Sequence, residues 1–145
     1  MRIRQLARHE IRSELARPDQ PWLQALCLRL RDLPPHPHNR VLIAEEDGNP
    51  RALLGLRLYW GGGGRLRRVI IAVLGVDPAH NRQGIGSRLI RFAEGIARIH
   101  GCTRVDVAPD LGRWEEGRCW PGLGYEGDGD GLAKELRSAP GRVSA

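Results

Sequence analysis

Lysine is almost absent from this chain. Only Lys134 among the 23 basic residues is a lysine, so the formal net charge of +6 is carried by arginine. The nucleotide-triphosphate loop that needs Gly-Lys-Ser/Thr is therefore excluded. The arginines are scattered through every segment and form no dense tail or aromatic-interleaved stripe, which argues against nucleic-acid binding. The positive field still favours a polyanionic ligand.

Long apolar runs and paired cysteines are also missing. No stretch approaches the roughly 20 apolar residues that a membrane span needs. The start, Met1–Gln5, has basic residues with no apolar region after them, so we expect no secretory signal, no membrane association and cytoplasmic residence. Three cysteines without metal-type spacing predict reduced thiols and no metal site; they are Cys27, Cys102 and Cys119.

The length of 145 residues suits one domain with a genuine core and is too short for two. We expect this domain over residues 1–137 and a disordered tail over 138–145. The pattern of apolar residues predicts β-α-α-β-β-β-α-β-α-β-β, an α+β fold with one mixed sheet flanked by helices. The predicted strands cover 3–6, 40–46, 51–60, 68–76, 103–107, the vicinity of 125, and 132–136; the predicted helices cover 8–17, a segment capped by Asp19, 85–100 and 111–120.

The most informative segment runs from Val76 to Leu89, where an apolar strand leads through a glycine-containing loop into an amphipathic helix. Gly84 and Gly86 carry no Cβ, so the backbone can turn sharply there and approach a ligand closely. The first N–H groups of the helix lack intrahelical partners and the helix dipole adds positive charge, which suits a phosphate. A simple tight strand-to-helix connection is the alternative.

The helix after this loop shows a clear division into two faces. One face carries apolar residues at helical spacing and is predicted to contact the core; these residues are Ile85, Leu89, Phe92, Ala93, Ile96, Ala97 and Ile99. The other face is predicted to be solvated, with Arg88, Arg91, Glu94 and Arg98. The dinucleotide fingerprint Gly-x-Gly-x-x-Gly is absent from the loop.

Two blocks resemble signatures of the GNAT superfamily of N-acetyltransferases. Val76-Asp77-Pro78 followed by Asn81-Arg82-Gln83-Gly84-Ile85-Gly86 is similar to its acetyl-CoA-binding motif Gln/Arg-x-x-Gly-x-Gly/Ala, with Asn81 departing at the first position. Cys119–Glu126 resembles its later Phe-Tyr-x-x-Leu-Gly-Phe block. The resemblance implies the GNAT fold and acetyl-CoA as acyl donor.

Cofactor contacts are also implied by this resemblance. The pantetheine arm would contact the backbone of Leu74, Gly75 and Val76, where this strand splays from its neighbour and where Gly75 tolerates a bulge. The pyrophosphate would contact the loop amides of residues 82–87, which are Arg82, Gln83, Gly84, Ile85, Gly86 and Ser87.

Catalytic candidates follow less directly. Acetyl transfer requires a deprotonated amine, and Asp106 resembles the glutamate of the Leu-Glu-Val segment in a branch that acetylates protein N-termini, which makes it a candidate base. Asp106 could equally face solvent on a half-exposed strand. Trp120 stands where many members have a tyrosine acid, so it is predicted to wall the acyl pocket. Either Tyr59 serves as the acid, or protonation of the leaving thiolate is dispensed with.

The resemblance thus predicts an enzyme that transfers an acetyl group from acetyl-CoA to an amine of a small molecule or a peptide. Two alternatives stay open: a non-catalytic CoA-binding or regulatory module of the same fold, and a basic nucleic-acid-binding domain. No nucleic-acid partner is expected, and a homodimer is compatible with the frequent dimers of the family.

Overall fold

The computed structural model describes residues 1–15, 19–26, 30, 39–80, 84–112, 119–128 and 131–136. The described strands form one seven-stranded sheet in the order β1-β2-β3-β4-β5-β7-β6. Its strands are β1 (Arg2–Gln5), β2 (Arg40–Glu46), β3 (Asn49–Trp60), β4 (Leu66–Val76), β5 (Arg104–Val107), β6 (Glu126–Asp128) and β7 (Gly131–Glu135). Among the described strands, only β4 and β5 pair in parallel, so the sheet is mixed as predicted.

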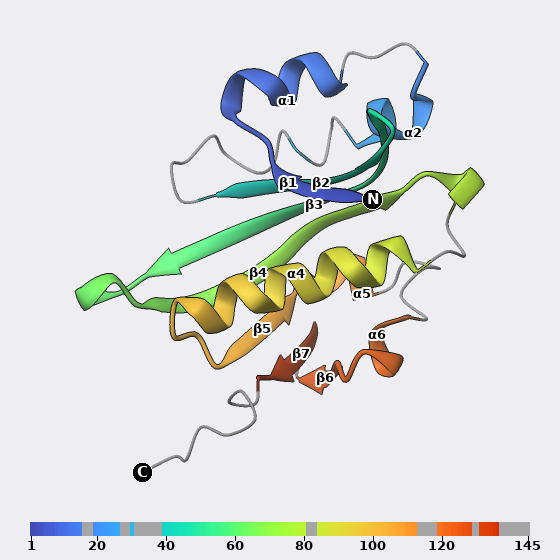
Figure 1. Cartoon of the computed structure of the whole chain (residues 1–145). Coiled ribbons are helices and arrows are strands. Elements are labelled where there is room, and N and C mark those ends of the chain that lie inside the picture. Colours follow the sequence, from blue (N-terminus) through green and yellow to red (C-terminus); the bar gives the residue numbers. More distant parts are fainter. Residues whose placement is uncertain are drawn as a thin grey trace.

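Helices cover both faces of this sheet (Figure 1). The helices are α1 (Arg8–Leu15), α2 (Pro21–Ala25), α4 (Ile85–Ile99), α5 (Pro109–Gly112) and α6 (Cys119–Gly122). On one face, α4 and α6 contribute to a large apolar core with residues such as Leu54, Ile71 and Leu89. On the other face, Leu23 and Leu26 form a smaller core with Leu53 and Val73.

The hairpin between β2 and β3 forms where the sequence predicts it. Asp47 and Gly48 adopt φ values of +52° and +76°, which lie in the left-handed region that two-residue hairpin turns require. By contrast, the predicted cap of α2 is wrong. Gln20, not Asp19, immediately precedes the helix, and it makes no capping side-chain hydrogen bond. Pro21, which fixes its own φ, is the first residue of α2.

The apolar periodicity of α4 predicted its range better than the burial of its individual residues. Its predicted range is nearly right, but Phe92 and Ile99 are 43% and 81% exposed, whereas Glu94 is buried. Phe92 and Ile99 are seven residues apart and therefore lie along the same edge of the helix, beyond its contact with the sheet. In the part of the chain that the structure describes, no helix is both long and apolar enough to cross a membrane. The predicted tail, 138–145, lies outside the described residues.

Candidate functional site

The loop before α4 opens onto a helix N-terminus whose amides are free of intrahelical partners. Gly84 precedes the helix with a φ of +73°, a conformation that favours glycine, and makes no side-chain cap. The N–H of Arg88 donates to the Gly84 carbonyl at 3.1 Å, which is the first hydrogen bond of the helix. The amides of residues 85–87 therefore have no carbonyl within the helix to bind, and they can bind an anion.

Gly86 faces the end of β4. A Cβ at position 86 would lie 3.2 Å from Cγ2 of Val76, so a larger side chain would push against the strand. The glycine keeps the first turn of α4 close to the strand that leads into it. Of the residues predicted to bind pyrophosphate, Gly84, Ile85, Gly86 and Ser87 occupy this helix start; Arg82 and Gln83, like Asn81, lie outside the described residues.

Beside this helix start, β4 and β5 separate. Their parallel ladder covers only three residue pairs and ends at Ile71 and Val107, with the Ala108 N–H donating to the Ile71 carbonyl at 2.9 Å. The β4 strand continues to Val76, whereas β5 ends at Val107. In the described part of the chain, no strand pairs with the 72–76 segment on this side. The two strands therefore form a fork that points toward the start of α4.

A β-bulge interrupts β4 directly after Ile71, where the fork begins. Gly55 pairs with Val73 and Leu56 with Ile71, so Ala72 is an extra residue in β4. Beyond it, the Asp77 N–H donates to the Arg51 carbonyl at 2.7 Å. Along an antiparallel strand, successive residues direct their N–H and C=O groups alternately toward the partner strand and away from it. Since Asp77 bonds to β3, Leu74 and Val76 direct their backbone groups away from β3, into the fork.

Gly75 is not the position of the predicted bulge. The bulge lies three residues earlier, and the alternation turns the Gly75 backbone toward its partner Leu53 in β3. The glycine is instead needed for packing, because a Cβ at position 75 would collide with the side chain of Leu26. Gly75 thus lets the apolar face of α2 approach the part of β4 that borders the fork.

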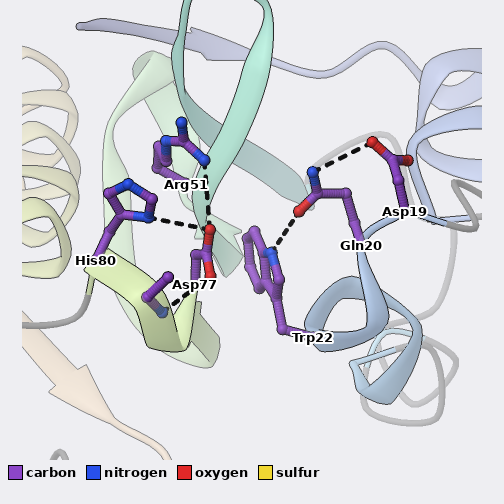
Figure 2. Close-up of polar contacts among 7 residues, drawn as sticks. Asp19, Gln20, Trp22, Arg51, Asp77 and His80 are labelled. Atoms are coloured by element: carbon purple, nitrogen blue, oxygen red, sulfur yellow. Dashed lines mark hydrogen bonds and ion pairs between the residues drawn. The ribbon is translucent and has the colours of Figure 1, made fainter.

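A cluster around Asp77 holds the turn between β4 and the helix start (Figure 2). One carboxylate oxygen accepts the Ala79 N–H at 3.1 Å. The other lies 3.1 Å from Nδ1 of His80 and 3.4 Å from an Nη of Arg51. This network fixes the short 3₁₀ turn at Pro78–His80, and the guanidinium of Arg51 offsets a negative charge that would repel an anion nearby.

Figure 2 also shows a chain of side chains at the start of α2. Trp22 Nε1 donates to the side-chain oxygen of Gln20 at 2.8 Å, and the Gln20 amide donates to Asp19 at 3.4 Å. Both polar networks were missed in the sequence. Only Asp-Pro at positions 77 and 78 could have indicated the first, because aspartate before proline favours a turn.

Asp106 lies one residue before the end of the β4–β5 ladder. Its neighbours Val105 and Val107 enter the core under α4, so its own side chain points to the opposite face of the sheet. Its Oδ1 accepts from Nε and Nη2 of Arg104 at 3.0 and 2.9 Å, and its Oδ2 accepts from Nε of Arg68 at 3.3 Å. Asp106 is thus neither buried nor simply solvated; it is held by two arginines beside the fork.

Tyr59 shares this face of the sheet. It pairs with Arg68 in the β3–β4 register, and directly paired residues have side chains on the same side. Its side chain is exposed. The structure therefore brings two sequence candidates, Tyr59 and Asp106, to one face of the sheet, but Tyr59 lies beside Arg68, before the first pair of the β4–β5 ladder and away from the fork.

Trp120 lies on the other face, fully buried in the core under α4. Its Nε1 donates to the Leu111 carbonyl at 3.4 Å, and its ring meets Tyr125 edge to face with centroids 5.2 Å apart. The tryptophan connects α6 with α5, the helix that directly follows β5. Trp120 and Asp106 are therefore separated by the sheet.

Glu94 was predicted to be solvated, and this is wrong. It is 2% exposed, accepts a hydrogen bond from the Tyr125 hydroxyl at 2.8 Å and lies 3.1 Å from Nζ of Lys134, the single lysine of the chain. The carboxylate can be buried because both of its oxygens are satisfied and its charge is paired. This cluster ties α4 to β7 and to the segment that carries Trp120.

The geometry suits a ligand with an anionic end and an extended arm. The helix start offers free amides to phosphate, and the fork offers backbone groups to a chain that lies along β4 as a strand would. The described residues contain no cluster of three histidine, cysteine or acidic side chains that could hold a metal ion.

Comparison with known proteins agrees with this geometry. A model of the acetyltransferase (GNAT) family matches residues 4–113, well over half of the chain. A search of curated proteins finds no significant match.

Solved structures share the fold at low identity. An aminoglycoside 6'-N-acetyltransferase complexed with coenzyme A superposes with a TM-score of 0.65 at 15% identity, covering 97% of this chain and 99% of that one. The enzyme of the same activity from Enterococcus faecium gives 0.67 at 15%, with the same coverage. One from Acinetobacter haemolyticus gives 0.62 at 19%, covering 99% and 100%. At these identities the likeness establishes the fold.

Proposed function

Because the chain belongs to the GNAT acetyltransferase family, we propose that it transfers an acetyl group from acetyl-CoA to the amine of a small molecule or a peptide. The observation that carries the proposal is the fork between β4 and β5 beside the uncapped start of α4. Three similar structures are of enzymes that acetylate an amino group of a small molecule, which supports that acceptor class.

The residues at the site fit acetyl-CoA. The amides of residues 85–87 would bind its pyrophosphate, with Gly84 leaving the approach open and Gly86 keeping the first turn of α4 close to β4. The outward backbone groups of Leu74 and Val76 would bind the pantetheine arm in the fork. Arg82 and Gln83 remain predicted contacts of the same loop. When bound, acetyl-CoA supplies an acetyl group activated as a thioester.

Asp106 is the proposed base, and its position beside the fork supports this role. An amine is protonated near neutral pH and must lose a proton before its nitrogen can attack. Transfer then makes one N–C bond and breaks one C–S bond. Of the two protons that the ammonium nitrogen gives up, one ends on the thiol and one in solvent. Tyr59, on the same face, is the candidate to donate to the departing sulfur, and Trp120 remains the proposed wall of the acyl pocket.

The competing function is a CoA-binding module without catalysis. Release of free CoA in the presence of an amine and peptide panel distinguishes the two, because only the enzyme consumes acetyl-CoA in an acceptor-dependent manner. The binding step is tested separately by thermal unfolding with and without acetyl-CoA. Ligand at about 100 times its Kd should raise the free energy of unfolding by about 2.7 kcal/mol.

Gly84→Val tests the site with a well-matched control. Gly84 and Gly48 have φ values of +73° and +76°, and neither has an atom within 4 Å of an added Cβ. Valine at either position should therefore cost similar backbone strain. Only Gly84→Val should abolish the acetyl-CoA-dependent stabilisation. Equal stabilisation of both variants by acetyl-CoA would refute the proposed binding site.

A further inference from the structure

The Asp77 carboxylate lies close to the helix start that would bind pyrophosphate. Val76, the residue before it, packs so near the first turn of α4 that a Cβ at Gly86 would lie 3.2 Å from its Cγ2. Consecutive Cα atoms are about 3.8 Å apart, so the carboxylate is within roughly 10 Å of the free amides of α4. This separation is about one Debye length at physiological salt. An unbalanced charge on Asp77 would therefore weaken the binding of a phosphate there.

The turn after β4 nevertheless depends on this carboxylate. One Asp77 oxygen accepts the Ala79 N–H at 3.1 Å, and the other lies 3.1 Å from Nδ1 of His80. These contacts hold the 3₁₀ turn at Pro78–His80, which leads from β4 toward α4. A carboxylate only accepts hydrogen bonds, so Nδ1 of His80 carries the hydrogen, in a neutral ring as well as in a protonated one. The imidazole can thus satisfy Asp77 without bringing a charge.

Arg51, from the neighbouring strand β3, supplies the balancing charge (Figure 2). Its Nη1 lies 3.4 Å from the Asp77 oxygen that also faces His80. A guanidinium is not deprotonated in proteins, so this charge is present at any pH. The contact is long, and Nε of Arg51 is buried with no hydrogen-bond partner among the described residues. A buried N–H without a partner destabilises a fold, so stability does not explain why a guanidinium is placed here.

We propose that Arg51 determines the affinity for the phosphate-bearing donor. It cancels the charge of the Asp77 carboxylate, which the turn requires and which would otherwise repel the pyrophosphate. Arg51 acts through Asp77 in this role and needs no contact with the donor. The inference rests on the proposed function, in that acetyl-CoA is the donor.

The test measures the Kd of acetyl-CoA by calorimetry for variants that change the charge of this pair in opposite directions. Arg51→Gln leaves Asp77 unbalanced and should weaken binding by about three- to tenfold at low salt, the range expected for one charge acting on a doubly charged pyrophosphate at this distance. Asp77→Asn keeps an oxygen for the Ala79 N–H, leaves Arg51 unbalanced, and should strengthen binding by a similar factor. The double variant should bind like the native chain.

Arg98→Gln is the control, because it removes the same charge elsewhere. Arg98 is exposed in the last turn of α4, about 20 Å along the helix from its start. Its replacement should leave the Kd of acetyl-CoA nearly unchanged.

Salt and a conservative variant separate charge from structure. Salt screens these charges, so the differences in Kd between the variants should shrink as the salt concentration rises. Arg51→Lys keeps the charge and should retain most of the affinity. A purely structural role of the pair predicts instead that both single variants bind more weakly, that the double variant is no better, and that salt has no effect.

The outcomes distinguish this inference from the proposed function. Weaker binding in Asp77→Asn, no recovery in the double variant, or differences that do not respond to salt would overturn the role of Arg51 and leave the donor site intact. The expected pattern without acceptor-dependent release of CoA would support the role of Arg51 and refute the proposed enzyme. If the native chain does not bind acetyl-CoA, both the donor and the role of Arg51 are refuted.

Discussion

The side chain of Leu26 fills the space that a Cβ at position 75 would need. Gly75 therefore determines how closely α2 approaches β4. Gly75→Ala should lower the free energy of unfolding by about 1 to 3 kcal/mol through overpacking. Leu26→Ala in the same chain should recover part of this loss, because it removes the colliding atoms. Gly95→Ala is the control: it lies within α4 with no atom near its added Cβ, and should stabilise by about 0.5 to 1 kcal/mol. Chemical denaturation measures all four proteins.

Asp106→Asn should reduce turnover by about 100-fold or more at neutral pH, since an amide cannot take a proton from the amine. The acetyl-CoA-dependent rise in Tm should persist, because the amides of α4 and the fork are unchanged. Asp47→Asn in the distant β2–β3 turn is the control and should retain full turnover. Undiminished turnover of Asp106→Asn would place the base elsewhere and leave Asp106 as a structural partner of its two arginines.

Three substitutions at Trp120 separate its contribution to packing from any contribution to catalysis. Trp120→Ala should cost about 3 to 5 kcal/mol of stability, because the indole is fully buried. Trp120→Phe loses the hydrogen bond to Leu111 but keeps most of the contact, and should retain much of the activity. Trp120→Tyr supplies a phenol. Higher turnover of this variant in steady-state assays would mean that the native reaction is slowed by the absence of an acid. Unchanged turnover would mean that the reaction does not need an acid at this position.

The pair of Glu94 and Lys134 should behave as a buried ion pair. Lys134→Met leaves the carboxylate buried with only the Tyr125 hydroxyl, at a cost of about 3 kcal/mol, the lower end for such pairs because Lys134 keeps some solvent contact. Adding Glu94→Gln removes the unpaired charge, and the new side-chain amide can still accept a hydrogen bond from the Tyr125 hydroxyl. The double variant should therefore be more stable than Lys134→Met alone. Additive losses in thermal unfolding would contradict this coupling.

Acid should loosen the attachment of α1. The Glu10 carboxylate accepts the Ala7 N–H at 3.0 Å and an Nη of Arg4 at 2.7 Å, and these contacts hold the pKa of Glu10 below its usual 4.5. A lowered pKa in the folded state means that the stabilisation is present above pH 4.5 and is lost as the pH falls below it. The Tm difference between the native chain and Glu10→Gln should therefore shrink on acidification.

Sequence patterns predicted most of the elements and the helix start, because these depend on local chemistry. Alternation and helical spacing mark strands and α4, Asp-Gly marks the β2–β3 turn, and Gly84 and Gly86 mark a close backbone approach. The two blocks that resemble the GNAT signatures indicated the family, and the family match confirms it.

The apolar periodicity was less informative about which residues of α4 are buried against the rest of the protein. Glu94, Phe92 and Ile99 lie near the edges of the apolar stripe on α4, where a small rotation of the helix decides between core and solvent. Glu94 is buried because Tyr125 and Lys134, from distant segments, satisfy its oxygens. No local pattern contains that information.

What the sequence by itself determined is the order of elements and the glycine-marked start of α4, since both follow from residues close together in the chain. Tertiary structure alone decided the bulge at Ala72, the fork after Ile71 and the opposite faces of Asp106 and Trp120. Strand register depends on the partner strand, and moving a strand by one residue exchanges its faces. The arginines that hold Asp106 therefore become visible only when the β3, β4 and β5 strands are paired.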